Sequence, residues 1–182
     1  MKITTAILLA LLAAGIGARL WLHSRQPSKP KFQNTEEFVA WLANESVKDA
    51  AQNNGVKLDY SIDSIKEVDQ ILGKLHDQYA KNPSSISVNG LAAAYGAYIG
   101  EVIRKSEPGA RWLRDDETGE KSYLIVWGPG QGHSYPMGWC YRRIVDGEED
   151  SVWIKYRAIK QGLTRNLGTS PETPHKRQPP PP

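Results

Sequence analysis

The chain has 182 residues, of which 40% are hydrophobic and 24% charged, and its net charge is +3. This length accommodates one domain with short extensions, and the composition is typical of a globular protein rather than a disordered one. Cys140 is the single cysteine of the sequence. The sequence therefore excludes an internal disulfide framework and any metal site built from several cysteines.

The excess of basic residues comes from the two ends of the chain. Residues 1–31 hold five basic and no acidic side chains, and residues 165–182 hold three basic and one acidic. Residues 32–164 hold 15 basic and 19 acidic side chains, which is a net charge of −4. A domain that binds duplex nucleic acid normally presents a basic face, because neutralising phosphates drives its affinity. We therefore expect no nucleic-acid partner.

Residues 3–22 form an apolar run in which Arg19 is the only charge. The uncharged part, residues 3–18, is short for a membrane span but long enough for the core of a signal peptide. The run predicts a membrane partner through residues 3–22, within an anchor or signal segment of residues 1–25. An uncleaved anchor with Trp21 at the interface is the first interpretation, a cleaved signal peptide the second and a buried helix the third.

The side of the membrane that the domain faces stays open. The positive-inside rule favours the cytoplasm, because most of the basic residues near the apolar run follow it, whereas a signal peptide would place the domain outside. Residues 26–33 contain two prolines and alternating lysines, and this composition predicts a linker. The folded domain is expected over residues 34–160.

Two helices are predicted at the start of the domain. Asn34 followed by Glu37 is a capping-box pattern, and Gly55 is suited to end the first helix. Its apolar stripe is predicted to contain Phe38, Trp41, Leu42, Val47 and Ala51. Ser61 is expected to cap a second helix, which ends before Pro83.

A third helix is predicted over residues 88–105, and it is rich in glycine and alanine. Glycines in a helix cost roughly 1 kcal/mol each relative to alanine. We expect the glycines, Gly96 and Gly100 among them, to be compensated by close backbone approach to another helix or to a sheet, which would make this the central helix. The GxxxG spacing also matches a membrane dimer, but Glu101 and Arg104 argue against insertion.

A β region is predicted after Gly109. Residues 110–114 and 122–127 flank an acidic turn, which indicates an antiparallel hairpin. Pro136 suits the first turn of a further helix that ends at Gly147, and residues 151–159 fit a helix better than a strand. Residues 161–182 predict a disordered, proline-rich tail. The predicted fold class is α+β, with helices packed on a short antiparallel sheet after the N-terminal membrane helix.

Most candidate chemical motifs have a simpler structural explanation. Residues 128–132 are rich in glycine but lack the spacing and the lysine of a phosphate loop, so we interpret them as a connection. Cys140 with His133 or His76 could form a nucleophile and a base. The position of Cys140 within an apolar helix face is more typical of a buried structural cysteine. We expect no metal and no cofactor, since at most two histidines could share a site.

Glu101 is the candidate buried polar residue of the third helix. We expect it to form an ion pair with Arg104 or Arg111. A catalytic alternative, a small hydrolase or transferase, would use Glu101 and His133 for acid–base chemistry. The acidic residues 115–117 are interpreted as a solvated turn.

Aromatic residues concentrate in residues 112–153, which hold four of the six tryptophans. Trp112 and Trp127 occupy hairpin positions and are expected in the core. Aromatic side chains next to arginines are typical of the residues that dominate protein interfaces. A partner-binding surface is therefore predicted from Tyr135, Trp139, Tyr141, Arg142 and Arg143.

Three segments carry a family resemblance. They are residues 58–69 (LDYSIDSIKEVD), residues 95–104 (YGAYIGEVIR) with Trp112 after them, and residues 142–151 (RRIVDGEEDS). Through them the chain resembles a small bacterial domain family of unknown function, over about residues 36–160. The resemblance implies helices on both sides of Gly147 but no activity, cofactor or catalytic residue. Some similar domains occur beside secreted-toxin genes, which suggests an immunity role by analogy.

The leading hypothesis is a non-enzymatic binding or adaptor domain on the bacterial inner membrane, attached by a single span. An immunity-type protein that binds a toxin is one form of it. A periplasmic or secreted location follows if the signal is cleaved. The alternatives are the small hydrolase or transferase and an envelope structural protein whose proline tail docks. The hypothesis predicts a protein partner and leaves the oligomeric state open.

Overall fold

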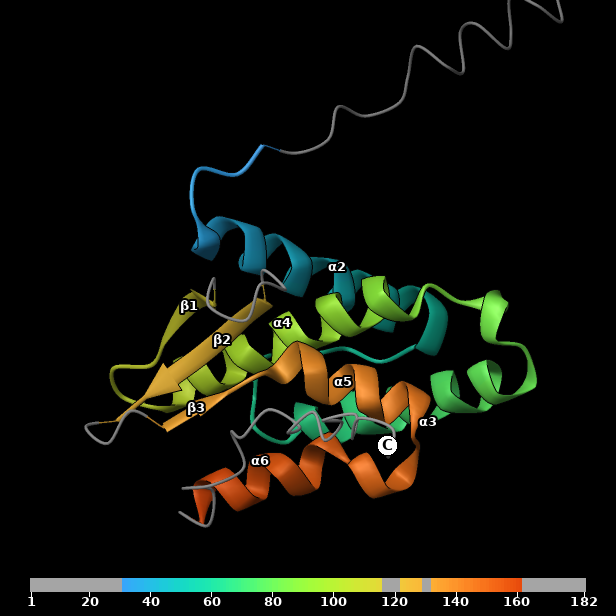
Figure 1. Ribbon diagram of the computed structural model, residues 1–182. Helices are drawn as coiled ribbons and strands as arrows, with labels where there is room; N and C mark the ends of the chain where they lie inside the picture. The colour runs from blue at the N-terminus through green and yellow to red at the C-terminus, as the bar shows by residue number, and fades with distance from the viewer. Residues whose placement is uncertain (1–30, 116–121, 129–131, 162–182) are drawn as a thin grey trace, which may run out of the picture. The chain divides into compact units, whose positions relative to one another are not determined.

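The computed structural model describes residues 31–115, 122–128 and 132–161, and those from Gln33 onward belong to one unit. The fold class is α+β as predicted, with five α-helices and a three-stranded antiparallel sheet in these residues (Figure 1). The elements are α2 (Thr35–Asn54), α3 (Ser64–Lys81), α4 (Val88–Ser106), β1 (Arg111–Asp115), β2 (Ser122–Trp127), β3 (Gly132–Ser134), α5 (Pro136–Val145) and α6 (Val152–Lys160). Two short 3-10 helices, η1 (Pro83–Ser85) and η2 (Glu148–Asp150), complete the set.

Several predictions fall on residues outside these ranges. They concern the apolar run of residues 3–22, most of the linker, most of the acidic turn after β1, the centre of the glycine-rich connection and the tail beyond Gln161. Among the helices that the structure does describe, none combines the length and the apolar character needed to cross a membrane.

The first helix, α2, begins and ends where the sequence predicts. The Asn34 side chain accepts a hydrogen bond from the Glu37 backbone N–H at 2.8 Å, and the Glu37 carboxylate accepts one from the Gln33 backbone N–H. Gly55 follows the helix with a left-handed φ of +67°, a conformation that glycine adopts without strain. Both capping predictions are confirmed.

The predicted apolar stripe of α2 is partly wrong. The buried residues of the helix are Val39, Leu42, Ala43, Ser46 and Ala50. Trp41 is 37% exposed, and Ala51 is exposed as well. The reason is the neighbour: α2 packs along α4, and small side chains on both helices allow the close approach, which leaves the large ring of Trp41 outside.

The chain between α2 and α3 is held by a tyrosine of α4. The Tyr60 backbone N–H donates to Tyr98 Oη at 2.7 Å, and the Ser64 and Tyr98 hydroxyls are 2.6 Å apart. Tyr60 adopts a φ of +61°, which is strained for a bulky residue. Its ring stacks on that of Tyr98 at 4.7 Å. The predicted cap Ser61 lies three residues before the start of α3, although its hydroxyl does accept the Ser64 N–H.

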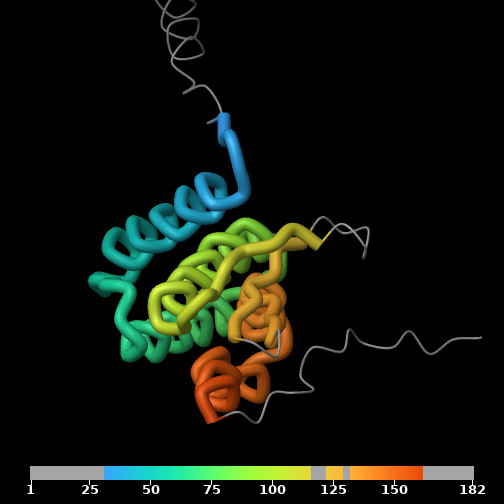
Figure 2. The backbone as a smooth tube through the Cα atoms, turned by 90° about the vertical axis from the view of Figure 1, so that its left-hand side faces the viewer, coloured from blue at the N-terminus to red at the C-terminus, as the bar shows by residue number. Residues whose placement is uncertain are grey.

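The central helix is α4, as predicted. It packs against α2, α5 and the sheet, and Figures 1 and 2 show it running between α2 and α5. A Cβ added at Gly96 would lie 2.3 Å from Met137 Cα, and one at Gly100 would lie 2.1 Å from Trp112 Cζ2. Both separations are shorter than van der Waals contact. The expected close backbone approach is therefore confirmed at Gly96, whereas Gly100 is approached by the side chain of Trp112.

The hairpin of β1 and β2 is confirmed, whereas β3 was not predicted, because three residues are too few to show an alternating pattern. β2 pairs with β1 on one side and with β3 on the other, both antiparallel. The register places Trp112, Ile125 and Ser134 side by side on the buried face. Neighbouring residues point to opposite faces of a strand, so His133 lies on the other face.

Two helices close the fold. α5 starts at Pro136, which occupies its first turn as predicted, and Gly147 follows its end with a φ of +104°. The ambiguous segment after it is the helix α6, which packs on α3 and α5. The fold thus brings α3, α5 and α6 together, although α3 and α5 are separated in the chain by α4 and the sheet.

Candidate functional site

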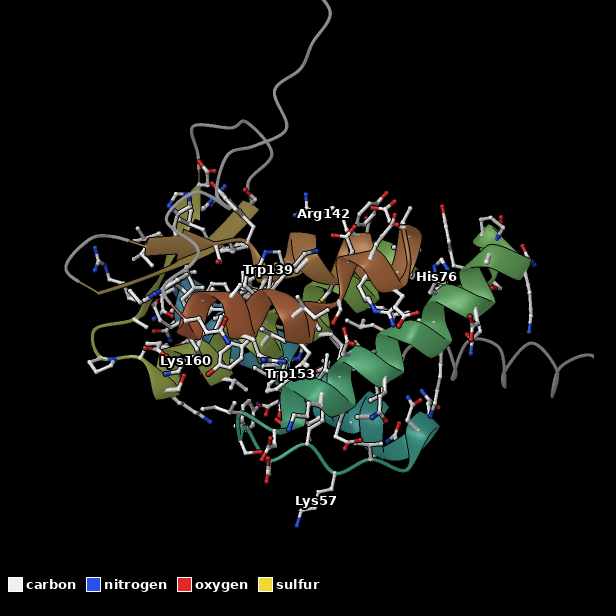
Figure 3. The ribbon with its side chains drawn as sticks, turned by 90° about the horizontal axis from the view of Figure 1, so that it is seen from below. Lys57, His76, Trp139, Arg142, Trp153 and Lys160 are labelled. Carbon is white, nitrogen blue, oxygen red and sulfur yellow. The ribbon has the colours of Figure 1, made fainter. Side chains whose placement is uncertain are left out.

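The predicted partner-binding residues of α5 divide between two sides of the helix. Tyr141 is 43% exposed and Arg142 is exposed beside it, whereas Trp139 and Arg143 are buried. Figure 3 shows Arg142 at the rim of the domain and Trp139 among the helices. Residues 139 and 143 are four positions apart and therefore share one helix face. This inward face removes Trp139 and Arg143 from the predicted surface.

The fifth predicted residue, Tyr135, precedes α5 and is half-buried. Its hydroxyl donates to Asp115 Oδ2 at 2.9 Å, and its ring meets that of His133 edge-on at 6.0 Å. Tyr135 therefore ties the start of α5 to β1. The structure does not place it beside Tyr141 and Arg142 on the exposed side of the helix.

Arg142 belongs to an ionic surface that joins α5, η2 and α6. Its Nε lies 3.5 Å from Asp150 Oδ1, and the Lys155 ammonium donates to the same carboxylate oxygen and to the Asp150 carbonyl. Burial lowers the pKa of Lys155 from its ordinary value, while the Asp150 carboxylate opposes that shift. We name Tyr141, Arg142, Asp150 and Lys155 the α5 surface.

A largely buried ionic cluster lies on the inward side of α5. Arg143 Nε is 3.4 Å from Asp69 Oδ1 on α3. Asp69 also accepts from the Ser151 hydroxyl at 3.1 Å and from the Val152 backbone N–H at 2.8 Å. Val152 is the first residue of α6. At this end of a helix a carboxylate accepts from an otherwise unpaired N–H and interacts favourably with the positive end of the helix dipole. We name these four residues the Asp69 cluster, which fixes α3, α5 and α6 together.

Of the two arginines predicted as partners of Glu101, Arg104 forms the ion pair and Arg111 is not its partner. Glu101 is 7% exposed, and Arg104 donates to its two oxygens at 2.9 and 2.8 Å. The Trp112 indole N–H also donates to the carboxylate, at 2.9 Å. Burial acts to raise the pKa of Glu101, but the bonds from Arg104 and Trp112 together lower it below its ordinary value. We name these three residues the Glu101 cluster.

Sequence reasoning missed the part of Trp112 in this cluster. A tryptophan expected in the core needs a partner for its N–H, and this requirement was the available signal. It could not identify Glu101 as the acceptor, because the two residues belong to different elements.

The structure does not bring Glu101 and His133 together. The Glu101 carboxylate meets Trp112 on the buried face of the sheet, and both of its oxygens are already hydrogen-bonded. His133 is exposed and lies on the opposite face. In this arrangement the two side chains are not positioned to act on one substrate.

The other candidate nucleophile and base, Cys140 and His76, are both engaged in contacts within the domain. Cys140 is fully buried, and burial raises the pKa of its thiol, which disfavours the reactive thiolate. His76 Nδ1 donates to the Ile144 carbonyl at 2.9 Å. Within the described part of the chain, no three acidic, histidine or cysteine side chains are placed to hold a metal ion.

One comparison with known proteins gives a match. Residues 21–121, more than half of the chain, match a family of unknown function (DUF6278). No curated protein and no solved structure matches the chain. The matched range contains α2, α3, α4 and β1 and ends before α5. The chain belongs to the DUF6278 family.

Proposed function

We propose that this member of the DUF6278 family is a non-enzymatic binding domain, anchored in a bacterial membrane by residues 3–22, that binds a protein partner on the α5 surface. The observation that carries the proposal is the pair of exposed residues Tyr141 and Arg142 on a helix whose other side is buried. Tyrosine and arginine are enriched among the residues that dominate interface energies. A tyrosine ring also loses little conformational entropy when it is bound.

The rigidity of α5 supports this role. Arg143 ties the helix to α3 through Asp69, and Tyr135 ties its start to β1. Lys155 and Arg142 share the Asp150 carboxylate, which connects the exposed side to α6. A surface that is ordered before binding loses less entropy when the complex forms. The α5 surface therefore favours recognition of one defined partner.

The membrane part of the proposal rests on the sequence of residues 3–22. An uncharged stretch that precedes Arg19 and Trp21 is suited to a short span with an interfacial anchor. Neutralisation of a toxin is one form that the function could take, since an immunity protein acts by forming a stoichiometric complex. The proposal names the surface that would form such a complex.

Affinity purification of the full-length chain from its own host, in mild detergent, tests the proposal. We expect a protein partner in stoichiometric amount with the unmodified chain. The double variant Tyr141→Ala, Arg142→Ala is expected to lose it, because it removes the ring and the charge that the partner would contact. Arg157→Ala is the matched control, because Arg157 is an exposed arginine that lies on α6 instead of α5. This variant is expected to retain the partner.

Urea unfolding of each variant separates binding from folding. Surface substitutions of this kind are expected to change the free energy of unfolding by no more than about 0.5 kcal/mol. Equal recovery of the partner by the double variant and the control would move the binding site away from α5. Failure to recover any partner across growth conditions would contradict the binding function itself.

A further inference from the structure

An aromatic cluster lies at the end of α2 where the chain enters the domain. The Phe38 and Trp41 rings stack with centroids 6.5 Å apart, and the Phe38 ring lies 5.3 Å from that of Tyr123 in β2. Phe38 and Tyr123 are half-buried, whereas Trp41 is 37% exposed. We name these three residues the aromatic cluster, which extends from the core to the surface.

The core of the domain does not require the ring of Trp41. The buried residues of α2 are aliphatic or small, and they already pack along α4. Tryptophan presents a large apolar area with one polar N–H. An exposed tryptophan next to two further rings is therefore suited to contact a surface that offers both apolar and polar groups.

The charges around the cluster are mixed. Glu37 and Glu45 lie four residues before and four residues after Trp41 and therefore share its helix face, while Arg114 is the cross-strand neighbour of Tyr123. The two carboxylates beside Trp41 fit zwitterionic lipid headgroups better than a strongly anionic surface. Tyrosine and tryptophan are enriched where the polar headgroups meet the apolar interior of a bilayer.

The stretch of sequence between the proposed anchor and α2 is short. Residues 23–33, eleven in number, separate the apolar run from the helix cap Asn34. Eleven fully extended residues span at most about 40 Å. Phe38 and Trp41 follow within the first two turns of α2, so these two members of the aromatic cluster lie in the described helix that is nearest to the anchor along the chain.

We propose that the aromatic cluster docks on the headgroup region of the membrane that holds residues 3–22, so that the first turns of α2 contact the bilayer. This inference rests on the proposed membrane anchoring and adds a second membrane contact to it. The contact is apolar in origin, so it is expected to depend little on the charge of the lipids.

Two labelled positions on α2 test the docking. Ala40 and Ala51 are both exposed and are eleven residues apart, which places them about 20° apart around the helix and about 16 Å apart along it. Each is replaced in turn by cysteine (Ala40→Cys, Ala51→Cys) and coupled to a fluorophore in the full-length chain. Cys140 is fully buried, so the label reports the introduced position.

The labelled chains are reconstituted in phosphatidylcholine vesicles that contain a lipid with a quencher near its headgroup. We expect quenching at position 40 and little at position 51. The added substitution Trp41→Ser is expected to abolish the quenching at position 40. Replacing a quarter of the lipid with phosphatidylglycerol is expected to leave the difference between the positions unchanged.

Flotation of the same vesicles measures anchoring independently. Chains that do not float would overturn both the proposed anchor and the docking. Chains that float, but show no quenching at position 40 or equal quenching at both positions, would overturn the docking alone. A fluorescence change at position 40 that follows protein concentration instead of the quencher would indicate a second copy on the cluster and would also overturn it.

Discussion

The Glu101 cluster and the Asp69 cluster use the same chemistry over different lengths of chain. Glu101 and Arg104 are three residues apart on one helix, and Trp112 reaches them from the adjacent strand. Asp69 and Arg143 are 74 residues apart, and the bond to Val152 spans 83. One cluster therefore fastens a helix to the strand next to it, whereas the other holds three helices together.

The two clusters also differ in what remains when the carboxylate is removed. The Arg104 side chain is 41% exposed and can turn to water. The Arg143 side chain is 10% exposed and cannot. Removing one partner of a buried pair is costly because it leaves an uncompensated charge. The Asp69 cluster, whose bonds join residues far apart in the chain, is therefore expected to contribute more to the free energy of unfolding.

The largest effect is expected from Asp69→Ala. The substitution leaves Arg143, the Ser151 hydroxyl and the Val152 N–H without their acceptor. We expect the free energy of unfolding to fall by about 3 kcal/mol, the low end for breaking a buried ion pair. Urea unfolding of the full-length chain in detergent measures it.

Asp63→Ala is the control for that loss. Asp63 lies just before α3 and pairs with Lys66, but its side chain is 82% exposed. Exposed pairs contribute about 0.5 kcal/mol or less. If the two substitutions destabilised the protein equally, the Asp69 cluster would not be what holds the three helices together.

Gly100→Ala is expected to have the next largest effect. The added Cβ would overlap the flat ring of Trp112, which also donates to Glu101. Because the ring is wedged between α4 and the sheet, we expect a loss of about 2 kcal/mol, typical of overpacking. Thermal unfolding monitored by near-ultraviolet circular dichroism would report both the stability and the displaced ring.

Gly73→Ala provides the contrast at the Asp69 cluster. Its added Cβ would lie 2.8 Å from Arg143 Nη2, the far end of a flexible side chain. Alanine also improves helix propensity by up to about 1 kcal/mol, so the net change should be near zero. A loss as large as that of Gly100→Ala would show that the Arg143 guanidinium cannot move.

Among the three substitutions expected to destabilise the domain, Glu101→Gln is expected to have the smallest effect. Glutamine retains an oxygen that can accept from the Trp112 indole, and Arg104 regains water. We expect a loss of about 1 kcal/mol at neutral pH, less than for Asp69→Ala. A larger loss than that of Asp69→Ala would reverse the ranking of the two clusters.

The pH dependence of Glu101 sharpens this prediction. Its folded pKa lies below the ordinary value of 4.5, so its contribution to stability is fully present above that pH and is lost as the pH falls through the folded pKa. The unfolded state binds more protons in this window, and the free energy of unfolding therefore rises with pH. Urea unfolding on either side of pH 4.5 should show a flatter rise for Glu101→Gln than for the unmodified chain.

Local patterns predicted most of the secondary structure and the ion pair within the Glu101 cluster. The cap at Asn34, the glycine after α2 and the proline that opens α5 act within a few residues, and all three lie where expected. Glu101 and Arg104 form a pair for the same reason. Trp41 was predicted in the apolar stripe but is exposed, and Trp139 was predicted on the binding surface but is buried. Both predictions failed because exposure depends on which helix packs against each face.

The sequence by itself determined the α+β class, the ends of most helices and the lean character of α4, since each follows from the conformational preferences of neighbouring residues. Only the tertiary structure decided that Asp69 meets Arg143 and Val152, that Trp112 bonds to Glu101, and that Tyr141 and Arg142 remain outside while Arg143 points inward. These contacts join residues from different elements, and their partners are chosen by packing in three dimensions. A one-dimensional pattern cannot encode that choice.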